Sequence, residues 1–170
     1  MHKSHKVFLF ILIFFFNTLN LNAEEKITYL NIDFVIQNSN LGKSILKNLN
    51  NLDKENKKKF ELREKKLRQI ENDLINKKNI LSKDELETNI EKLKKDMNQF
   101  NLDRKKVNFE YNEKRKKAIN NFLQKITPLI ENYVKKNSIS LVLNQKNIFI
   151  GSKKYDITND IIEIVNQNFN

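Results

Sequence analysis

Two long heptad stripes, separated by a short polar break, constrain this chain more than any other feature. Apolar residues recur at alternating steps of three and four over residues 46–81 and again over 86–118. This spacing keeps one face of a helix against a partner helix, as in a coiled coil. Between the stripes, Ser82 and Glu85 have the spacing of a capping box, which starts a new helix. Two helices joined by so short a turn run antiparallel, so the sequence predicts one long hairpin.

Polar residues interrupt the predicted seam of this hairpin. Mirror pairing about the turn places Asp53 opposite Lys114 and Arg63 opposite Arg104. The first pair predicts an ion pair between the helices, of small value if it is exposed. Two arginines in one layer repel each other, so we expect their guanidinium groups to reach water and to pair with neighbouring carboxylates. The carboxylates within reach are Glu61, Glu64 and Asp103. An anion site between the two arginines is the alternative.

The first 23 residues have the features of a secretory signal peptide. Lys3 and Lys6 precede an unbroken apolar run at 7–16, and a more polar stretch ends at Ala23. The apolar run is shorter than the roughly 20 residues that a membrane-spanning helix needs. We therefore predict cleavage after Ala23 and export from the cytoplasm, with an uncleaved membrane anchor as the alternative.

The composition of the exported part argues against catalysis. His2 and His5 are the only histidines, both lie in the signal segment, and the chain has no cysteine. The remaining chain lacks the usual general base and the soft metal ligands of most hydrolases and zinc enzymes. Neither Gly42 nor Gly151 belongs to a phosphate-binding loop. We expect no enzyme activity, no catalytic residue, no metal site and no cofactor.

Positive charge is concentrated on the predicted hairpin. Residues 43–136 carry 26 basic and 15 acidic side chains, whereas the rest of the exported chain carries four and six. Such an excess attracts anionic partners, which include an acidic unfolded chain, an anionic lipid surface and nucleic acid. The export signal argues against nucleic acid. A general bias of the sequence toward lysine and asparagine explains the same counts without any partner.

The two ends of the chain have the alternation of short strands. The segments 26–32 and 138–144 read as strands, 148–151 reads as a second strand of the C-terminal part, and an amphipathic helix follows from 156 onward. The predicted fold class is therefore α+β. A small β-rich oligomerisation body carries a long antiparallel α-helical coiled-coil hairpin, which projects as an arm.

In this prediction the body consists of residues 24–42 and 137–170, and the arm of 43–136 with its hinge near 76–85. A body of about 50 residues without disulfides has a marginal core. We therefore expect its apolar strands to pack against copies of the same chain. The residues predicted for this contact are Ile27, Tyr29, Leu30, Ile32, Leu141, Val142, Leu143, Ile148, Phe149 and Ile150.

Several apolar residues of the arm lie outside the predicted seam. Leu102 and Phe109 are one heptad apart on the second helix, and Leu62 and Ile75 lie on the first. Scattered exposed apolar residues are common and usually have no function. Beside the basic residues Lys105 and Lys106, however, these four are the candidates for contact with a non-native chain.

The order of these parts resembles the Skp (OmpH) family of periplasmic chaperones. The likeness rests on a signal segment, the strand at 26–32, a charged hairpin, the strand at 139–144 and the ending at 155–161. It implies a periplasmic homotrimer whose bodies share a β-structure and whose arms enclose a cavity.

The resemblance also implies a task, which is to hold unfolded outer-membrane proteins without ATP until they insert. Whether an anionic lipid or lipopolysaccharide surface is a further partner stays open. A structural coiled-coil spacer or scaffold of the cell envelope is the alternative function, because it explains the signal, the arm and the oligomerisation equally well.

Overall fold

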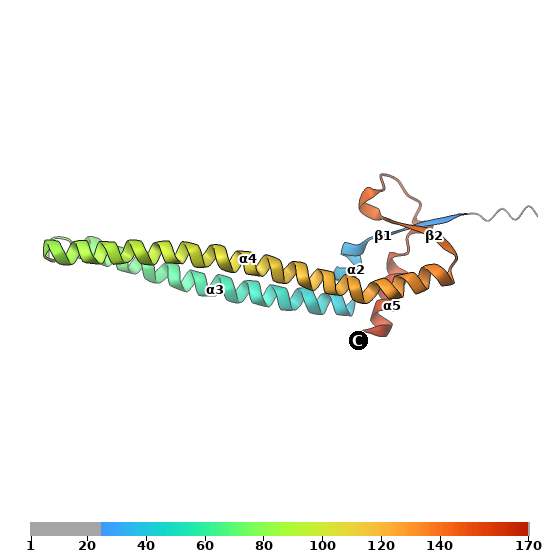
Figure 1. Ribbon diagram of the computed structural model, residues 1–170, viewed down its shortest axis with the longest axis horizontal. Helices are drawn as coiled ribbons and strands as arrows, with labels where there is room; N and C mark the ends of the chain where they lie inside the picture. Colours follow the sequence, from blue (N-terminus) through green and yellow to red (C-terminus); the bar gives the residue numbers. More distant parts are fainter. Residues whose placement is uncertain (1–24, 170) are drawn as a thin grey trace, which may run out of the picture.

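The computed structural model describes residues 25–169 and has one long arm projecting from a small body (Figure 1). The predicted signal peptide lies outside the described residues. The helices and strands follow in the order β1 (Lys26–Leu30), α2 (Ile32–Asn38), α3 (Asn40–Lys77), α4 (Lys83–Lys136), β2 (Ile139–Asn144), the short 3-10 helices η1 (Gln145–Asn147) and η2 (Lys153–Tyr155), and α5 (Thr158–Asn168). This arrangement confirms the predicted α+β class.

Helices α3 and α4 form the antiparallel hairpin, and the turn between them, residues 78–82, lies within the segment predicted for the hinge. The two helices are 38 and 54 residues long, or roughly 57 and 81 Å at 1.5 Å per residue. The capping box is formed as predicted. The Ser82 hydroxyl accepts from the amide of Glu85, and the Glu85 carboxylate accepts from the amide of Ser82. The chain therefore leaves the turn with its first helical amides satisfied.

The seam of the arm combines aromatic packing with one ion pair between the helices. The rings of Phe60 and Phe100 meet edge to face with centroids 5.7 Å apart, an arrangement that aromatic rings favour. Arg63 binds Asp103, which confirms the expected escape of this arginine from the seam. The predicted pair between Asp53 and Lys114 is wrong. Asp53 instead binds Lys57, one turn away on its own helix. Such a pair forms within one helix and does not depend on a side chain of the other helix.

The body has a two-stranded parallel sheet. Ile27 lies beside Leu141 and Tyr29 beside Leu143 in its register. The whole arm connects β1 to β2, and only a long connection allows neighbouring strands to run parallel. On its other edge, β1 is partly covered by the chain before α5, because the amide of Ile157 donates to the carbonyl of Tyr29 at 3.0 Å.

The core lies where the base of the arm meets the body. Apolar side chains with no exposed surface come from α2, α4 and α5, and they are Val35, Phe122, Ile126, Ile161 and Val165. Partly buried residues of α3, among them Ile45 and Leu46, pack around them. The proximal turns of the arm therefore supply much of the core that a body of about 50 residues lacks.

Two expectations for the body were wrong. Residues 148–151 form no strand within the described chain, and they pair with neither β1 nor β2. A strand without a partner has no hydrogen-bonding ladder to join. Ile32 does not extend β1 but begins α2, because the Asn31 side chain accepts from the amide of Phe34 and caps that helix. Among the described residues, no helix is long and apolar enough to cross a bilayer.

Candidate functional site

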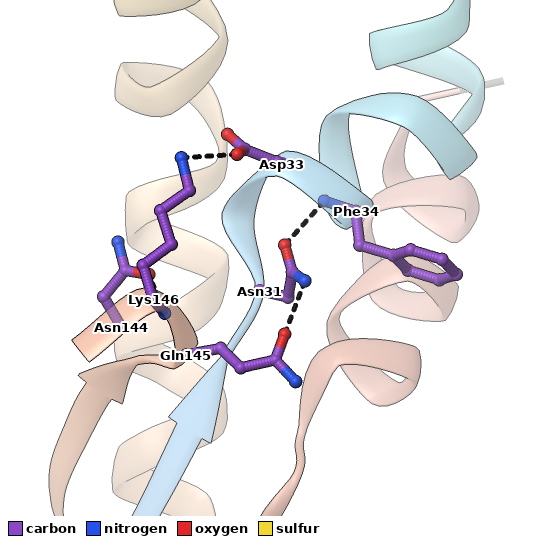
Figure 2. A network of polar contacts seen from close by, with 6 residues as sticks. All are labelled: Asn31, Asp33, Phe34, Asn144, Gln145 and Lys146. Atoms are coloured by element: carbon purple, nitrogen blue, oxygen red, sulfur yellow. Dashed lines mark hydrogen bonds and ion pairs between the residues drawn. The ribbon is translucent and has the colours of Figure 1, made fainter. Parts of the chain in front are cut away.

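A polar network links the segments that meet at one end of the sheet (Figure 2). Asn31, between β1 and α2, donates through its side-chain amide to Gln145, which follows β2, at 2.5 Å. Lys146 forms an ion pair with Asp33 at 2.5 Å. The backbone amide of Asn31 donates to the Thr158 hydroxyl at 3.0 Å. Segments far apart in the sequence are thus tied together at the end of the sheet.

The outer face of the sheet is apolar and open. Ile27, Leu141 and Leu143 are each more than a third exposed, and they share one face because side chains alternate along a strand. A cavity of about 360 Å³ lies over this face. Its apolar lining comes from Ile27, Tyr29, Leu143, Ile148 and Tyr155. A single copy of the chain therefore leaves uncovered an apolar surface next to its own core.

The loop after β2 exposes its largest apolar side chains. Phe149 is 99% exposed and Ile150 is 83% exposed. The same loop passes close to the sheet, since a Cβ on Gly151 would lie 3.0 Å from the ring of Tyr29. Two large apolar residues held in solvent beside an apolar face are typical of a surface that another molecule covers.

The residues predicted for contact between copies fall into two groups. Ile27, Leu141, Leu143, Phe149 and Ile150 are exposed and available. Leu30 and Tyr29 are almost fully buried in the single chain, and Ile32, Val142 and Ile148 are partly buried. The apolar run alone does not separate the groups. The alternation of side chains within each strand separates the two groups in part, because Leu30 lies on the inward-facing side of β1.

On the arm, the four apolar candidates for client contact are all more than half exposed, and Phe109 is the most exposed of them at 67%. Leu102 and Phe109 share one face of α4, one heptad apart. Ile75 lines a cavity near the turn. Lys105 is exposed, and Lys106 is exposed with its ammonium 4.0 Å from Glu110. The structure thus spreads the candidates along the arm and does not gather them into one pocket.

Several seam residues are more exposed than the heptad pattern suggests. Ile70, Ile90 and Met97 are each about two-fifths exposed. Two helices cover each other along one line only, so residues at the border of that line stay open to solvent on both sides. These residues were missed as candidate contact residues because the sequence assigns them to the interior. The signal that could have identified them is that the hairpin has only two helices, which cannot enclose a full seam.

Charge is not uniform along the arm. The stretches 43–70 and 98–136 each carry ten basic and four acidic side chains, whereas 71–97, around the turn, carries six basic and seven acidic. The shaft is therefore cationic and the tip nearly neutral. Within the shaft, hydrogen bonds from Arg63 and then from Gln99 hold the pKa of Asp103 below its usual value.

Exposed apolar side chains and positive charge are the main features of this surface. The arm offers exposed apolar side chains on a largely cationic shaft, which suits capture of apolar and acidic segments, and the body adds exposed apolar side chains beside its sheet. Within residues 25–169, no group of three potential metal-ligating side chains lies together. What the arrangement provides is exposed apolar and cationic surface.

The described chain is a small α+β body that carries a single long helical hairpin. The chain belongs to the outer membrane protein (OmpH-like) family, whose model matches residues 26–165. The match covers the entire arm and most of both body segments, and it confirms the family resemblance of the sequence.

The fold is also that of a solved structure. It is similar to a crystal structure from Caulobacter crescentus that is described as a candidate outer membrane chaperone (OmpH-like). The TM-score is 0.77 at 16% sequence identity, and the likeness covers 86% of this chain and 87% of that one. No functionally curated protein matches the chain.

Proposed function

We propose that this protein is an ATP-independent holdase of the periplasm that binds unfolded outer-membrane proteins and prevents their aggregation. The observation that carries the proposal is the surface of the arm, where Leu62, Leu102 and Phe109 stand exposed on a cationic shaft. An unfolded β-barrel protein exposes alternating apolar residues and aggregates readily. A surface with scattered apolar contacts binds such chains widely and without a fixed sequence.

The proposal includes a homotrimer assembled through the body, with three arms enclosing a cavity. It is supported by the exposed residues Ile27, Leu141, Leu143, Phe149 and Ile150, which a single chain leaves in solvent. Burial of apolar surface at about 25 cal/mol per Å² favours association of such faces. Self-association at one end leaves the arms free to project (Figure 1).

The cationic shaft has a role in the first encounter. Ten basic against four acidic side chains on each of its two stretches attract acidic segments over about 10 Å at moderate salt. An anionic lipid or lipopolysaccharide surface would meet the same charge and is a second partner of the proposal. Nucleic acid is not, because the proposed site of action is outside the cytoplasm.

The test is suppression of aggregation by the exported chain, residues 24–170. A urea-denatured outer-membrane protein is diluted into buffer with this chain and without ATP, and light scattering is recorded. The expected result is suppression at near-stoichiometric amounts. Absence of suppression contradicts the proposal and favours a structural spacer of the envelope.

A matched pair of variants locates the activity on the arm. The triple change Leu62→Ser, Leu102→Ser and Phe109→Ser removes exposed apolar side chains and leaves the core intact. The control, Gln69→Ser, Asn98→Ser and Asn112→Ser, alters three exposed polar positions on the same helices. We expect the first variant to need several-fold more protein for equal suppression and the second to match the natural chain. Equal behaviour of both variants contradicts the assignment to the shaft.

A further inference from the structure

The tip of the arm contains an apolar pocket that the heptad pattern does not predict. The pocket has a volume of about 400 Å³ and lies between α3 and α4 just before their turn. Its apolar lining is Leu74, Ile75, Leu86, Ile90, Leu93 and Met97. Glu71, Lys78 and Lys94 are the charged residues that border it.

The pocket has a buried floor and exposed walls. Leu93 is nearly buried, whereas Ile75, Ile90 and Met97 are 40% exposed or more. A bound apolar side chain would remove these walls from water without displacing any packed residue. Met97 adds a flexible and polarisable wall that adapts to ligands of different shape.

Charge excludes some occupants and favours others. The tip is the only one of the three arm stretches without excess positive charge, with six basic and seven acidic side chains over 71–97. An anionic headgroup finds a stronger field on the shaft than at this pocket. An uncharged apolar side chain has no such preference, and its binding free energy is most favourable where it covers exposed apolar surface.

We propose that the tip pocket binds one bulky uncharged side chain, such as phenylalanine or leucine, that projects from an extended non-native polypeptide. The inference rests on the proposed holdase function and adds that the shaft and the tip of the arm have different roles. The cationic shaft attracts acidic segments, and the tip anchors an apolar side chain. The volume is near the lower end of the range for small-molecule sites, which fits a single side chain better than a folded element.

The experiment uses the absence of cysteine and tryptophan in the chain. Lys78→Cys places a single label, an environment-sensitive dye, at the rim of the pocket on the exported chain. The probes are two uncharged 12-residue peptides of glycine and serine that differ only in a central phenylalanine or alanine. We expect the phenylalanine peptide to shift the emission of the dye and the alanine peptide to leave it unchanged.

Two variants test the lining. Ile75→Ser with Ile90→Ser removes two exposed walls, whereas Ile80→Ser removes an isoleucine that is 82% exposed in the turn and does not border the pocket. Helicity by circular dichroism verifies that each variant is folded. We expect the double variant to bind the phenylalanine peptide about tenfold more weakly or worse, and Ile80→Ser to bind it as the natural chain does.

Three results would overturn the inference. One is equal peptide affinity of the double variant and the natural chain. Another is a dye shift that grows with protein concentration alone, which indicates that a second copy fills the pocket. The third is a larger shift with phosphatidylglycerol vesicles than with the peptide. Because the peptide assay does not depend on aggregation, a holdase without a tip site and a tip site without holdase activity give different results.

Discussion

Arg63 on α3 binds Asp103 on α4 at 2.5 Å, and this ion pair joins the two helices of the arm at mid-length. The guanidinium group also lies 5.7 Å from the centroid of the Phe100 ring, close enough for a cation–π contact. A seam position occupied by arginine is thus satisfied by one carboxylate and one aromatic face. The arm tolerates an arginine at this seam position because its guanidinium group lies at the edge of the seam.

The ion pair predicts a dependence of arm stability on acid. The hydrogen bonds from Arg63 and Gln99 lower the pKa of Asp103 below its ordinary value of 3.8. A lowered pKa means that the contribution to stability is present above pH 3.8 and is lost as the pH falls through the lower value in the folded state. Thermal unfolding followed by circular dichroism between pH 5 and pH 2 measures this loss. Both partners are partly exposed, so the effect is small.

The matched variants for this measurement are Asp103→Asn and Glu113→Gln, which remove one negative charge each from α4. We expect Asp103→Asn to unfold at a lower temperature than the natural chain at pH 5, with the difference vanishing toward pH 2. Glu113→Gln should show no such difference, because within residues 25–169 its carboxylate forms no ion pair with α3. A constant difference between Asp103→Asn and the natural chain at every pH would contradict the prediction.

Phe122 anchors the base of the arm in the core of the body, and its side chain has no exposed surface. Phe122→Ala should lower the free energy of unfolding by about 3–5 kcal/mol, through lost burial and the cavity left behind. Phe109→Ala on the same helix is the control. It should change stability by less than about 0.5 kcal/mol, because Phe109 is mostly exposed. Urea unfolding at one fixed protein concentration measures both, and equal losses would contradict the assignment of the core.

The arm could be predicted from the sequence because its signals are local and repeated. The heptad steps fix which helix faces meet, and the spacing of Ser82 and Glu85 fixes where the second helix begins. The sequence does not select Asp103 as the partner of Arg63, because Glu61 and Glu64 also lie within reach. Only the spacing between the two helices selects one of them.

The body was harder to predict because its contacts join segments far apart in the chain. Residues 148–151 have the composition of a strand, yet they pair with neither strand of the sheet. A parallel pair of strands with a crossover of more than 100 residues leaves no local signal of its orientation. The exposure of Phe149 and the burial of Leu30 likewise depend on which side each segment presents after folding.

Gly42 lies buried in the first turn of α3, and its lack of a side chain lets α2 pack against that turn. A Cβ at this position would lie 2.0 Å from the carbonyl oxygen of Ile36, a backbone atom that cannot move alone. Gly42→Ala should therefore lower the free energy of unfolding by about 1–3 kcal/mol, as overpacking of a tight core does. Gly151→Ala is the control, since its nearest neighbour is the ring of Tyr29 at 3.0 Å, which can shift. A larger loss for Gly151→Ala than for Gly42→Ala would refute this account.

Tyr133 on α4 donates its hydroxyl hydrogen bond to Asp160 on α5 and holds the last helix against the arm base. Burial, and then the hydrogen bond to this carboxylate, raises the pKa of Tyr133 to about 12. The contribution of Tyr133 to stability is therefore complete below the ordinary pKa of 10.0 and is lost as the pH rises through about 12. Absorbance at alkaline pH should show one of the four tyrosines ionising late. Tyr133→Phe should remove that late step, and Asp160→Asn should move it to lower pH. Alkaline titration curves that superimpose for all three proteins would show that the contact between α4 and α5 does not form as described.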